Sequence, residues 1–204
     1  MKFSLMTYTF ARQAKTQDAA FVRELFRYAV ELKMDGIDMV TTYGVPAGEL
    51  RKMSGDCGIP IVAHTFFTDL NHADAAARQA GVDAAKRGLD DAVAMGAPIV
   101  MVVTPGKPDL SAADSRRNWI AGLGEVMPFA KTAGITLTVE NFPGATSPFV
   151  TSADVLAATK ILPDLKLTFD NGNCETGGEP AAVSFKRSKN LVVHAHFKDW
   201  DRFP

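Results

Sequence analysis

Short apolar runs rich in β-branched residues alternate with longer stretches of helical period along this chain, and this alternation constrains its fold most strongly. Several runs, such as PIVMVV, ITLTV and LVVHAHF, are apolar nearly throughout, which is typical of parallel strands covered on both faces. The predicted strands are Lys2–Thr9, Gly36–Val40, Ile59–Phe66, Pro98–Val103, Ile135–Val139, Leu165–Phe169 and Leu191–Phe197.

Six helical segments are expected between these strands, and glycines placed as C-caps support two of them. Gly96 and Gly134 follow the stretches that end at Met95 and Thr132. The segments that can be delimited are Asp18–Lys33, Ala73–Met95, Ser111–Thr132, Ser152–Ile161 and, shortest, Glu179–Ser188.

A regular strand–helix succession of this kind gives either an open doubly wound sheet or a closed (β/α)8 barrel. The strands recur every 25–37 residues or so, near the roughly 30 residues per unit of an eightfold barrel. A dinucleotide-binding sheet would need a G-x-G-x-x-G turn after a strand, and the sequence has none. The barrel is therefore the preferred fold class.

Only seven strands are predicted, and the 204-residue chain ends at Pro204, soon after the seventh. A closed barrel needs an eighth strand with its helices, roughly 50 residues more. We therefore expect a single domain over residues 1–204 that lacks its C-terminal strand-eight region.

Composition excludes some classes of partner. With 22 basic and 23 acidic residues the formal net charge is −1, so no global field would attract nucleic acid or an anionic membrane. No run approaches the ~20 apolar residues that cross a bilayer. Cys57 and Cys174 lie far apart, without a disulfide-scaffold pattern, which favours a reducing, cytoplasmic setting. Homo-oligomerisation is left open, because no apolar stripe argues for it.

Polar residues stand at the ends of three consecutive predicted strands. Glu140 lies in TVENFP, Asp170 in TFDNGN, and His194 and His196 in HAHFKDW, where their spacing of two puts both on one face of the strand. Reactive groups of parallel barrels stand at these strand ends. A single strand-end glutamate is more often an ion-pair partner, and a single rim histidine more often structural. Convergence of two carboxylates and an imidazole favours a divalent-metal site instead.

Several further residues are candidates for the same mouth. Lys198, two residues after His196, could neutralise developing charge or form only a rim ion pair with its acidic neighbour. His64, at the end of the third predicted strand, could bind a sugar hydroxyl or be structural. Tyr8 and Phe10, at the end of the first, could wall a pocket or simply pack. We interpret His194 as a supporting or substrate-binding histidine rather than a ligand.

The VEN, D-x-G-N and H-x-H-x-K-D motifs resemble those of the xylose isomerase-like, or AP endonuclease family 2, TIM barrels, which include sugar phosphate isomerases and epimerases. The resemblance runs through essentially the whole chain. It implies that Glu140, Asp170 and His196 bind the metal. The family's fourth ligand is a glutamate that ends strand eight, and no residue of this chain matches it.

Two positions depart from the pattern of many members. Asn173 stands three residues after the strand-six aspartate, where many carry a histidine; it can hydrogen-bond a substrate hydroxyl but cannot titrate. Asp38 stands where many carry a glutamate at the end of strand two. These departures concern the choice of substrate rather than the metal.

The function that the resemblance implies is a metal-dependent isomerase or epimerase that acts on a ketose or keto-sugar through an enediolate. Mn²⁺ is the expected cofactor, ahead of Mg²⁺, Co²⁺, Fe²⁺ or Zn²⁺. Glu140 is expected to be both ligand and catalytic base, with Lys198 as a second catalytic candidate. A small sugar or sugar-like molecule is the expected partner, with no nucleic acid and no membrane.

Three other functions use the same scaffold. A lyase or dehydratase acting on an inosose, a dehydroshikimate-like acid or a 3-keto-glycoside shares the enediolate. An endonuclease would need several metals, more histidines and a basic DNA face, and this chain has four histidines. The last of the three is a non-catalytic barrel that binds a sugar or interacts with another protein.

Overall fold

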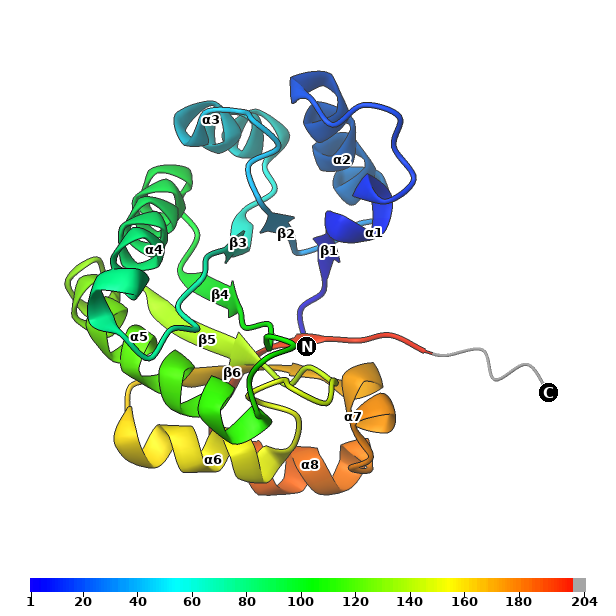
Figure 1. Ribbon diagram of the computed structural model, residues 1–204. Helices are drawn as coiled ribbons and strands as arrows, with labels where there is room; N and C mark the ends of the chain where they lie inside the picture. Colours follow the sequence, from blue (N-terminus) through cyan, green and yellow to red (C-terminus); the bar gives the residue numbers. More distant parts are fainter. Residues whose placement is uncertain (200–204) are drawn as a thin grey trace.

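A computed structural model describes residues 1–199 of the chain. Seven parallel strands form one curved sheet in sequential order, each paired with the next (Figure 1). The strands are β1 Ser4–Met6, β2 Gly36–Val40, β3 Ile61–Phe67, β4 Ile99–Val103, β5 Thr136–Glu140, β6 Lys166–Asp170 and β7 Val192–His196. This confirms the predicted class, a (β/α)8-type barrel, with seven strands within residues 1–199. Residues 200–204 of the predicted domain lie outside the described part.

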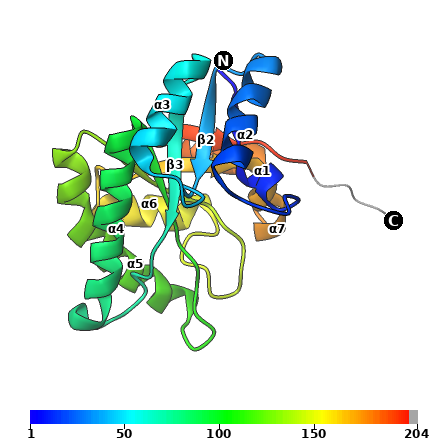
Figure 2. The ribbon, with the colours of Figure 1, turned by 90° about the horizontal axis from the view of Figure 1, so that it is seen from above.

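Helices cover the convex side of the sheet, as Figures 1 and 2 show. Their apolar stripes supply buried leucines to the layer between helices and sheet, among them Leu50, Leu89 and Leu123. Burying each such side chain contributes about 1.5–3 kcal/mol. The helices are α1 Tyr8–Ala11, α2 Ala19–Glu31, α3 Ala47–Cys57, α4 Ala75–Met95, α5 Ala112–Thr132, α6 Ser152–Ile161, α7 Asn171–Gly177 and α8 Ala181–Ser188. Within the described part, none is long and apolar enough to cross a membrane.

The structure corrects the prediction for the first strand. Within the predicted range Lys2–Thr9 only Ser4–Met6 is strand, because the backbone turns helical at Thr7 and α1 begins at Tyr8. A short segment of mixed polar and apolar residues does not by itself distinguish strand from helix.

Besides α1, two helices lie outside the helical ranges delimited from the sequence, α3 and α7. Helix α3 contains Gly48 and Gly55, which are poor helix formers, and its buried side is narrow. Helix α7 follows β6 without a loop, because Asp170 both ends the strand and caps the helix by accepting from the backbone N–H of Asn173.

Strand register decides which side chains face the barrel interior. In β3, Phe66 faces α4, where its ring lies so close to Gly88 that a Cβ there would collide with it. Alternate residues of the strand therefore face inward. Parallel partners share a face, and Thr168 pairs with His194 while Asp170 pairs with His196. The carboxyl ends of β6 and β7 thus direct their polar residues to one interior layer.

Gly81 provides a test of how closely α4 packs. A Cβ at this position would collide with the backbone carbonyl of Asp69, and the Thr68 hydroxyl donates to the Gly81 carbonyl at 2.6 Å. Gly81→Ala should lower the free energy of unfolding, measured in urea, by about 1–3 kcal/mol through overpacking. Gly55→Ala is the control: a Cβ there meets nothing within 4 Å, so the helix should gain up to about 1 kcal/mol. Equal stability of the two variants would contradict this packing.

Glu179 joins α6 to α8 through a buried carboxylate that is 8% exposed. It accepts from the backbone N–H and hydroxyl of Ser152 at 2.7 and 2.8 Å, and from Arg187 at 3.0 Å. Burial alone would raise the pKa of Glu179, but these donors outweigh it and hold the pKa below its ordinary value of 4.5.

A lowered pKa makes the contribution of Glu179 depend on pH. The stabilisation is fully present above pH 4.5 and is lost as the pH falls through the lower folded-state pKa. At pH 7, Glu179→Gln should reduce the free energy of unfolding by about 1–3 kcal/mol. Urea titrations at a series of pH values should show this difference shrinking below pH 4.5. A difference independent of pH would refute the role of the carboxylate charge.

Candidate metal and active site

His196, the last residue of β7, lies between two carboxylates from other strands. Its Nδ1 donates to Glu140 Oε1 of β5 at 2.5 Å, and its Nε2 donates to Asp38 Oδ2 of β2 at 3.1 Å. The ring is buried, with 8% of its side chain exposed. Three strands are therefore joined through one imidazole.

Asp38 also binds the other histidine of β7. His194 Nε2 donates to the same oxygen, Asp38 Oδ2, at 2.9 Å, and the two imidazole rings lie perpendicular to each other. Asp38 is 1% exposed, in the middle of a strand buried throughout. Its second oxygen, Oδ1, has no hydrogen-bond partner among the described residues.

These contacts set the charges of the cluster. Burial opposes ionisation of Asp38, but the hydrogen bonds from His194 and His196 outweigh it and hold its pKa well below the ordinary value. Burial likewise favours the neutral ring of His196, yet its two carboxylate partners raise the pKa of His196 to about 10. These contacts favour the protonated ring of His196, which lies between the carboxylates of Asp38 and Glu140.

Asp170 is the third carboxylate of the cluster. Its Oδ1 accepts from the backbone N–H of Asn173 at 2.7 Å, and its Oδ2 pairs with Lys198 Nζ at 2.9 Å. The Asn173 amide also donates to Glu140 Oε2 at 3.3 Å. The structure thus brings together Glu140, Asp170, His196, Lys198 and Asn173, as predicted from the strand ends.

Asn141 fixes the spacing between β5 and β6 beside this cluster. Its side-chain oxygen accepts from the backbone N–H of Asp170 at 2.9 Å, and its amide donates to the carbonyl of the same residue at 2.8 Å. The amide also lies 3.2 Å from Cys174 Sγ. This two-way bond places the carboxylates of Glu140 and Asp170 next to each other.

The cluster meets the requirements of a divalent-cation site. Ligand atoms of Glu140, Asp170 and His196 all lie within 4.8 Å of one another, and the same holds for Asp38, His194 and His196. The first set offers two carboxylates and one imidazole, a donor set suited to hard or borderline cations such as Mn²⁺ and Mg²⁺. The three carboxylates of Asp38, Glu140 and Asp170 outnumber the two basic groups that pair with them, His196 and Lys198, so a cation could neutralise the remaining negative charge.

His64 does not join the cluster. It lies two residues before Phe66 and so on the face of β3 that packs against the helices. Its Nδ1 lies 3.0 Å from the Met39 carbonyl, and burial lowers the pKa of His64. These contacts are those of a structural histidine.

Tyr8 and Phe10 lie on α1 rather than on a strand. The Phe10 ring packs edge-on against Tyr28 of α2, with ring centroids 5.3 Å apart. Tyr8 is half exposed beneath the guanidinium of Arg12. The contacts of Phe10 are therefore packing contacts between α1 and α2.

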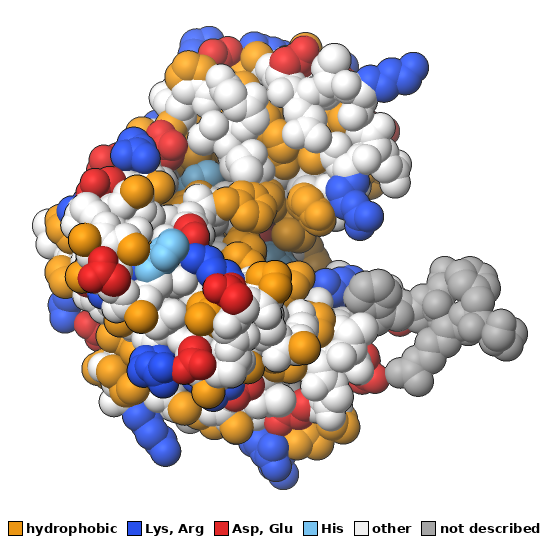
Figure 3. Space-filling view, in the orientation of Figure 1, with side chains coloured by type: hydrophobic (Ala, Val, Ile, Leu, Met, Phe, Trp, Pro, Cys, Tyr) orange, Lys and Arg blue, Asp and Glu red, His pale blue; other side chains and the backbone are white. Residues whose placement is uncertain are grey.

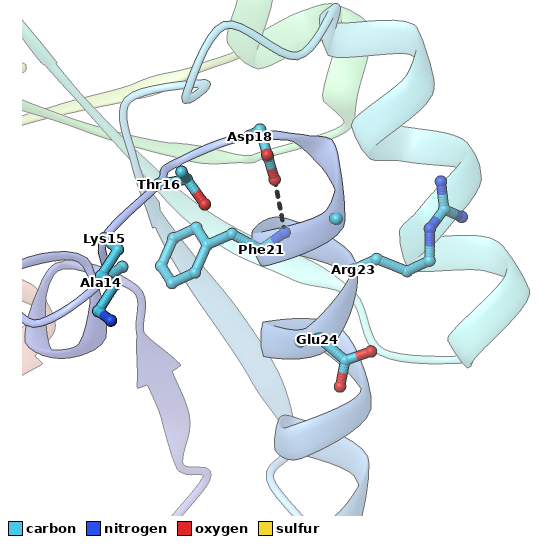
Figure 4. Close-up of a pocket in the computed structure, with 8 residues that line it drawn as sticks. Ala14, Lys15, Thr16, Asp18, Phe21, Arg23 and Glu24 are labelled. Atoms are coloured by element: carbon cyan, nitrogen blue, oxygen red, sulfur yellow. Dashed lines mark hydrogen bonds between the residues drawn. The ribbon is translucent and has the colours of Figure 1, made fainter.

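Hydrophobic side chains gather at the hollow on the concave side of the sheet (Figure 3). Three exposed phenylalanines end or follow strands: Phe67 at β3, Phe142 after β5 and Phe197 after β7. A separate open pocket of about 460 Å³ lies beside the start of α2 (Figure 4). Lys15, Thr16 and Phe21 are among its lining residues, none of which belongs to the cluster.

Comparison with protein families shows which family of barrels this chain belongs to. Residues 26–204 match the family described as xylose isomerase-like TIM barrel. The chain belongs to this family. The resemblance seen in the strand-end motifs is thereby confirmed, while a comparison with curated proteins gives no match.

Solved structures with this family's fold are similar over almost the whole chain. A structure of L-ribulose 3-epimerase superposes with a TM-score of 0.85 at 18% identity, covering 97% of this chain and 70% of that one. D-psicose 3-epimerase in the presence of D-fructose gives 0.81 at 18% identity, covering 98% and 73%. The probable 3-DHS dehydratase AsbF from Bacillus anthracis gives 0.76 at 17% identity, covering 98% and 73%.

The sequence indicated most members of the cluster but not the position of Asp38. From the sequence, Asp38 is a short acid in place of a glutamate, whereas the structure places it in contact with both histidines. One signal was present in the sequence: Asp38 is the single charged residue of the otherwise apolar strand GIDMV. A lone acid in a buried strand needs a partner, and its partners come from a strand about 155 residues later, which no local pattern shows.

Proposed function

We propose that this protein is a divalent-metal-dependent epimerase or isomerase of a ketose or keto-sugar. The observation that carries the proposal is the convergence of Glu140, Asp170 and His196, with ligand atoms within 4.8 Å of one another, at the carboxyl ends of three consecutive strands. Reactive groups of this fold stand at that end. The three residues are the proposed metal ligands, and Mn²⁺ is the proposed ion.

The ion would act as a Lewis acid, stabilising the enediolate that forms when the carbon beside a ketone loses its proton. Glu140 is the proposed base. Its Oε2 accepts from the side-chain amide of Asn173, a contact that would orient the carboxylate toward a substrate in the mouth. The second acid/base and the fourth ligand are expected from a glutamate at the end of an eighth strand.

Lys198 is the proposed second catalytic group. Its ammonium lies against Asp170, at the edge of the cluster, where it can stabilise negative charge that develops on a substrate oxygen. Asn173 is positioned to donate to a hydroxyl from the same side. Contacts of His194, His64, Tyr8 and Phe10 with substrate stay predictions, and the structure gives His194 and Phe10 other partners.

A small sugar is the proposed substrate, handled in the cytoplasm. The structural neighbours include D-psicose 3-epimerase with D-fructose and a D-allulose 3-epimerase in complex with D-allulose. These likenesses, at 15–18% identity, support the class of substrate and leave the particular sugar open. Both cysteines are free thiols, in keeping with a reducing compartment.

A dehydratase is the second candidate, because one structural neighbour is a probable 3-DHS dehydratase. The same proton abstraction by Glu140 would then be followed by loss of a β-hydroxyl. The two functions differ in product: a dehydratase accumulates an unsaturated compound, and an epimerase returns a proton to the same carbon from the opposite face. Absorbance of the conjugated product distinguishes them.

Metal binding can be tested on the protein without any substrate. Added Mn²⁺ at one hundred times its dissociation constant should stabilise the fold by about 2.7 kcal/mol and raise the melting temperature measured by calorimetry. EDTA should reverse the shift. Asp170→Asn, which keeps the size of the side chain, should abolish most of it, whereas the surface variant Asp56→Asn should not. Absence of any shift in the wild-type protein would exclude the metal-dependent function.

The role of Glu140 can be tested by proton exchange. In D₂O the wild-type enzyme should incorporate deuterium at the carbon beside the ketone of a ketose such as D-psicose or L-ribulose, as followed by NMR. Glu140→Gln should lower this exchange by a factor of about 10²–10⁴, the usual contribution of a general base. Glu175→Gln, a change at an exposed acid of α7, is the control and should leave exchange intact. Exchange retained by Glu140→Gln would rule out this base.

A further inference from the structure

The two ring nitrogens of His196 face two different carboxylates. Nδ1 faces Glu140, which lies with Asp170 on the side of the three proposed ligands. Nε2 faces Asp38, from β2, on the other side of the ring. An ion shared by Glu140, Asp170 and His196 would therefore meet Nδ1, and the Nε2–H would remain bonded to Asp38.

We propose that Asp38 is the positioning carboxylate of the metal centre: it accepts the Nε2–H of His196 and so presents Nδ1 to the ion. The inference rests on the proposed metal-dependent function. A metal-bound histidine whose other N–H donates to a carboxylate has a fixed tautomer and ring orientation, and it is a more basic ligand. Asp38 provides that acceptor at 3.1 Å from a position that is 1% exposed.

His194 completes the arrangement from the same strand. Its Nε2 donates to Asp38 Oδ2 at 2.9 Å, so a single carboxylate oxygen accepts from both histidines. Because Asp38 Oδ1 has no partner within residues 1–199, these two bonds hold the carboxylate in place. His194 thus acts on the metal centre through Asp38, which explains why both histidines of the H-x-H sequence face the interior.

The competing arrangement is an ion held by Asp38, His194 and His196 themselves, whose ligand atoms are equally close. That ion would bind Nε2 of His196 and would leave Glu140 and Asp170 outside the site. It would also have a single carboxylate and two imidazoles, a softer donor set that offers less negative charge. The set with Glu140 and Asp170 supplies two carboxylates, so we place the ion on the Nδ1 side.

The test compares Mn²⁺ affinity of the full chain and its variants, measured by the EPR signal of free Mn²⁺. Asp38→Asn keeps the shape of the side chain and removes its charge. It should weaken Mn²⁺ binding 10- to 100-fold, the usual effect of losing such a partner. Glu179→Gln also removes a buried carboxylate, one bonded to Ser152 and Arg187 instead, and should leave the affinity unchanged.

A second measurement stays informative if Asp38→Asn folds poorly. In the wild-type protein loaded with Zn²⁺, ¹⁵N shifts of the His196 ring should show Nδ1 bound to the metal and Nε2 protonated. Metal on Nε2, or loss of Mn²⁺ affinity in Asp38→Asn as complete as in Glu140→Gln, would make Asp38 a ligand and overturn the positioning role.

The remaining outcomes separate this inference from the proposed function. If wild-type protein binds Mn²⁺ and folded Asp38→Asn binds it within about threefold as well, the positioning role is wrong and the proposed function stands. If the wild-type protein binds no divalent ion, the proposed function fails, and the inference fails with it.

Discussion

The hydrogen bonds on the two sides of His196 are the interaction on which the site depends. They join Asp38 of β2, Glu140 of β5 and the end of β7, strands that are not neighbours in the sheet. Such contacts across the interior are available only when the sheet curls, so the helices that pack on its convex side indirectly set the geometry of the cluster. The ion pairs of His196 with Asp38 and Glu140 in turn stabilise the curled sheet, because flattening it would separate the partners and leave unpaired charge in the interior.

The parallel register explains why polar residues from distant parts of the sequence meet. Each strand sends alternate side chains inward, and paired residues of neighbouring strands share a face, as Asp170 does with His196. Local hydrogen bonds at the strand ends then fix the position of each carboxylate. Asp170 ends β6 and caps α7 with one oxygen, which leaves the other directed at Lys198. Asn141 locks β5 to β6 through both backbone groups of the same residue.

Much of this could be predicted from the sequence, because strand period and strand-end position are local properties. The seven strands and the trio Glu140, Asp170 and His196 follow from them. His64 shows the limit of this prediction. Its position near the end of a predicted strand does not tell which face of the sheet its side chain occupies, and a shift of one residue exchanges the barrel interior for the helix-covered face. The central position of Asp38 could not be predicted either, since it depends on curvature that brings β2 and β7 together.

The balance of charge shows how a fold and a metal site can share one set of residues. Asp38, Glu140 and Asp170 carry three negative charges, and His196 and Lys198 supply two positive ones within hydrogen-bonding distance. A proton on His196 Nδ1 occupies the side of the ring where an ion would bind, and the Lys198 ammonium occupies one oxygen of Asp170. Proton and ammonium therefore compensate the carboxylates in the absence of an ion, at the same atoms an ion would use. The site is preformed for a metal ion because the folded chain already places positive groups against the same carboxylate oxygens. Asp38, on the far side of the imidazole, would hold the His196 ring in place both with and without the ion.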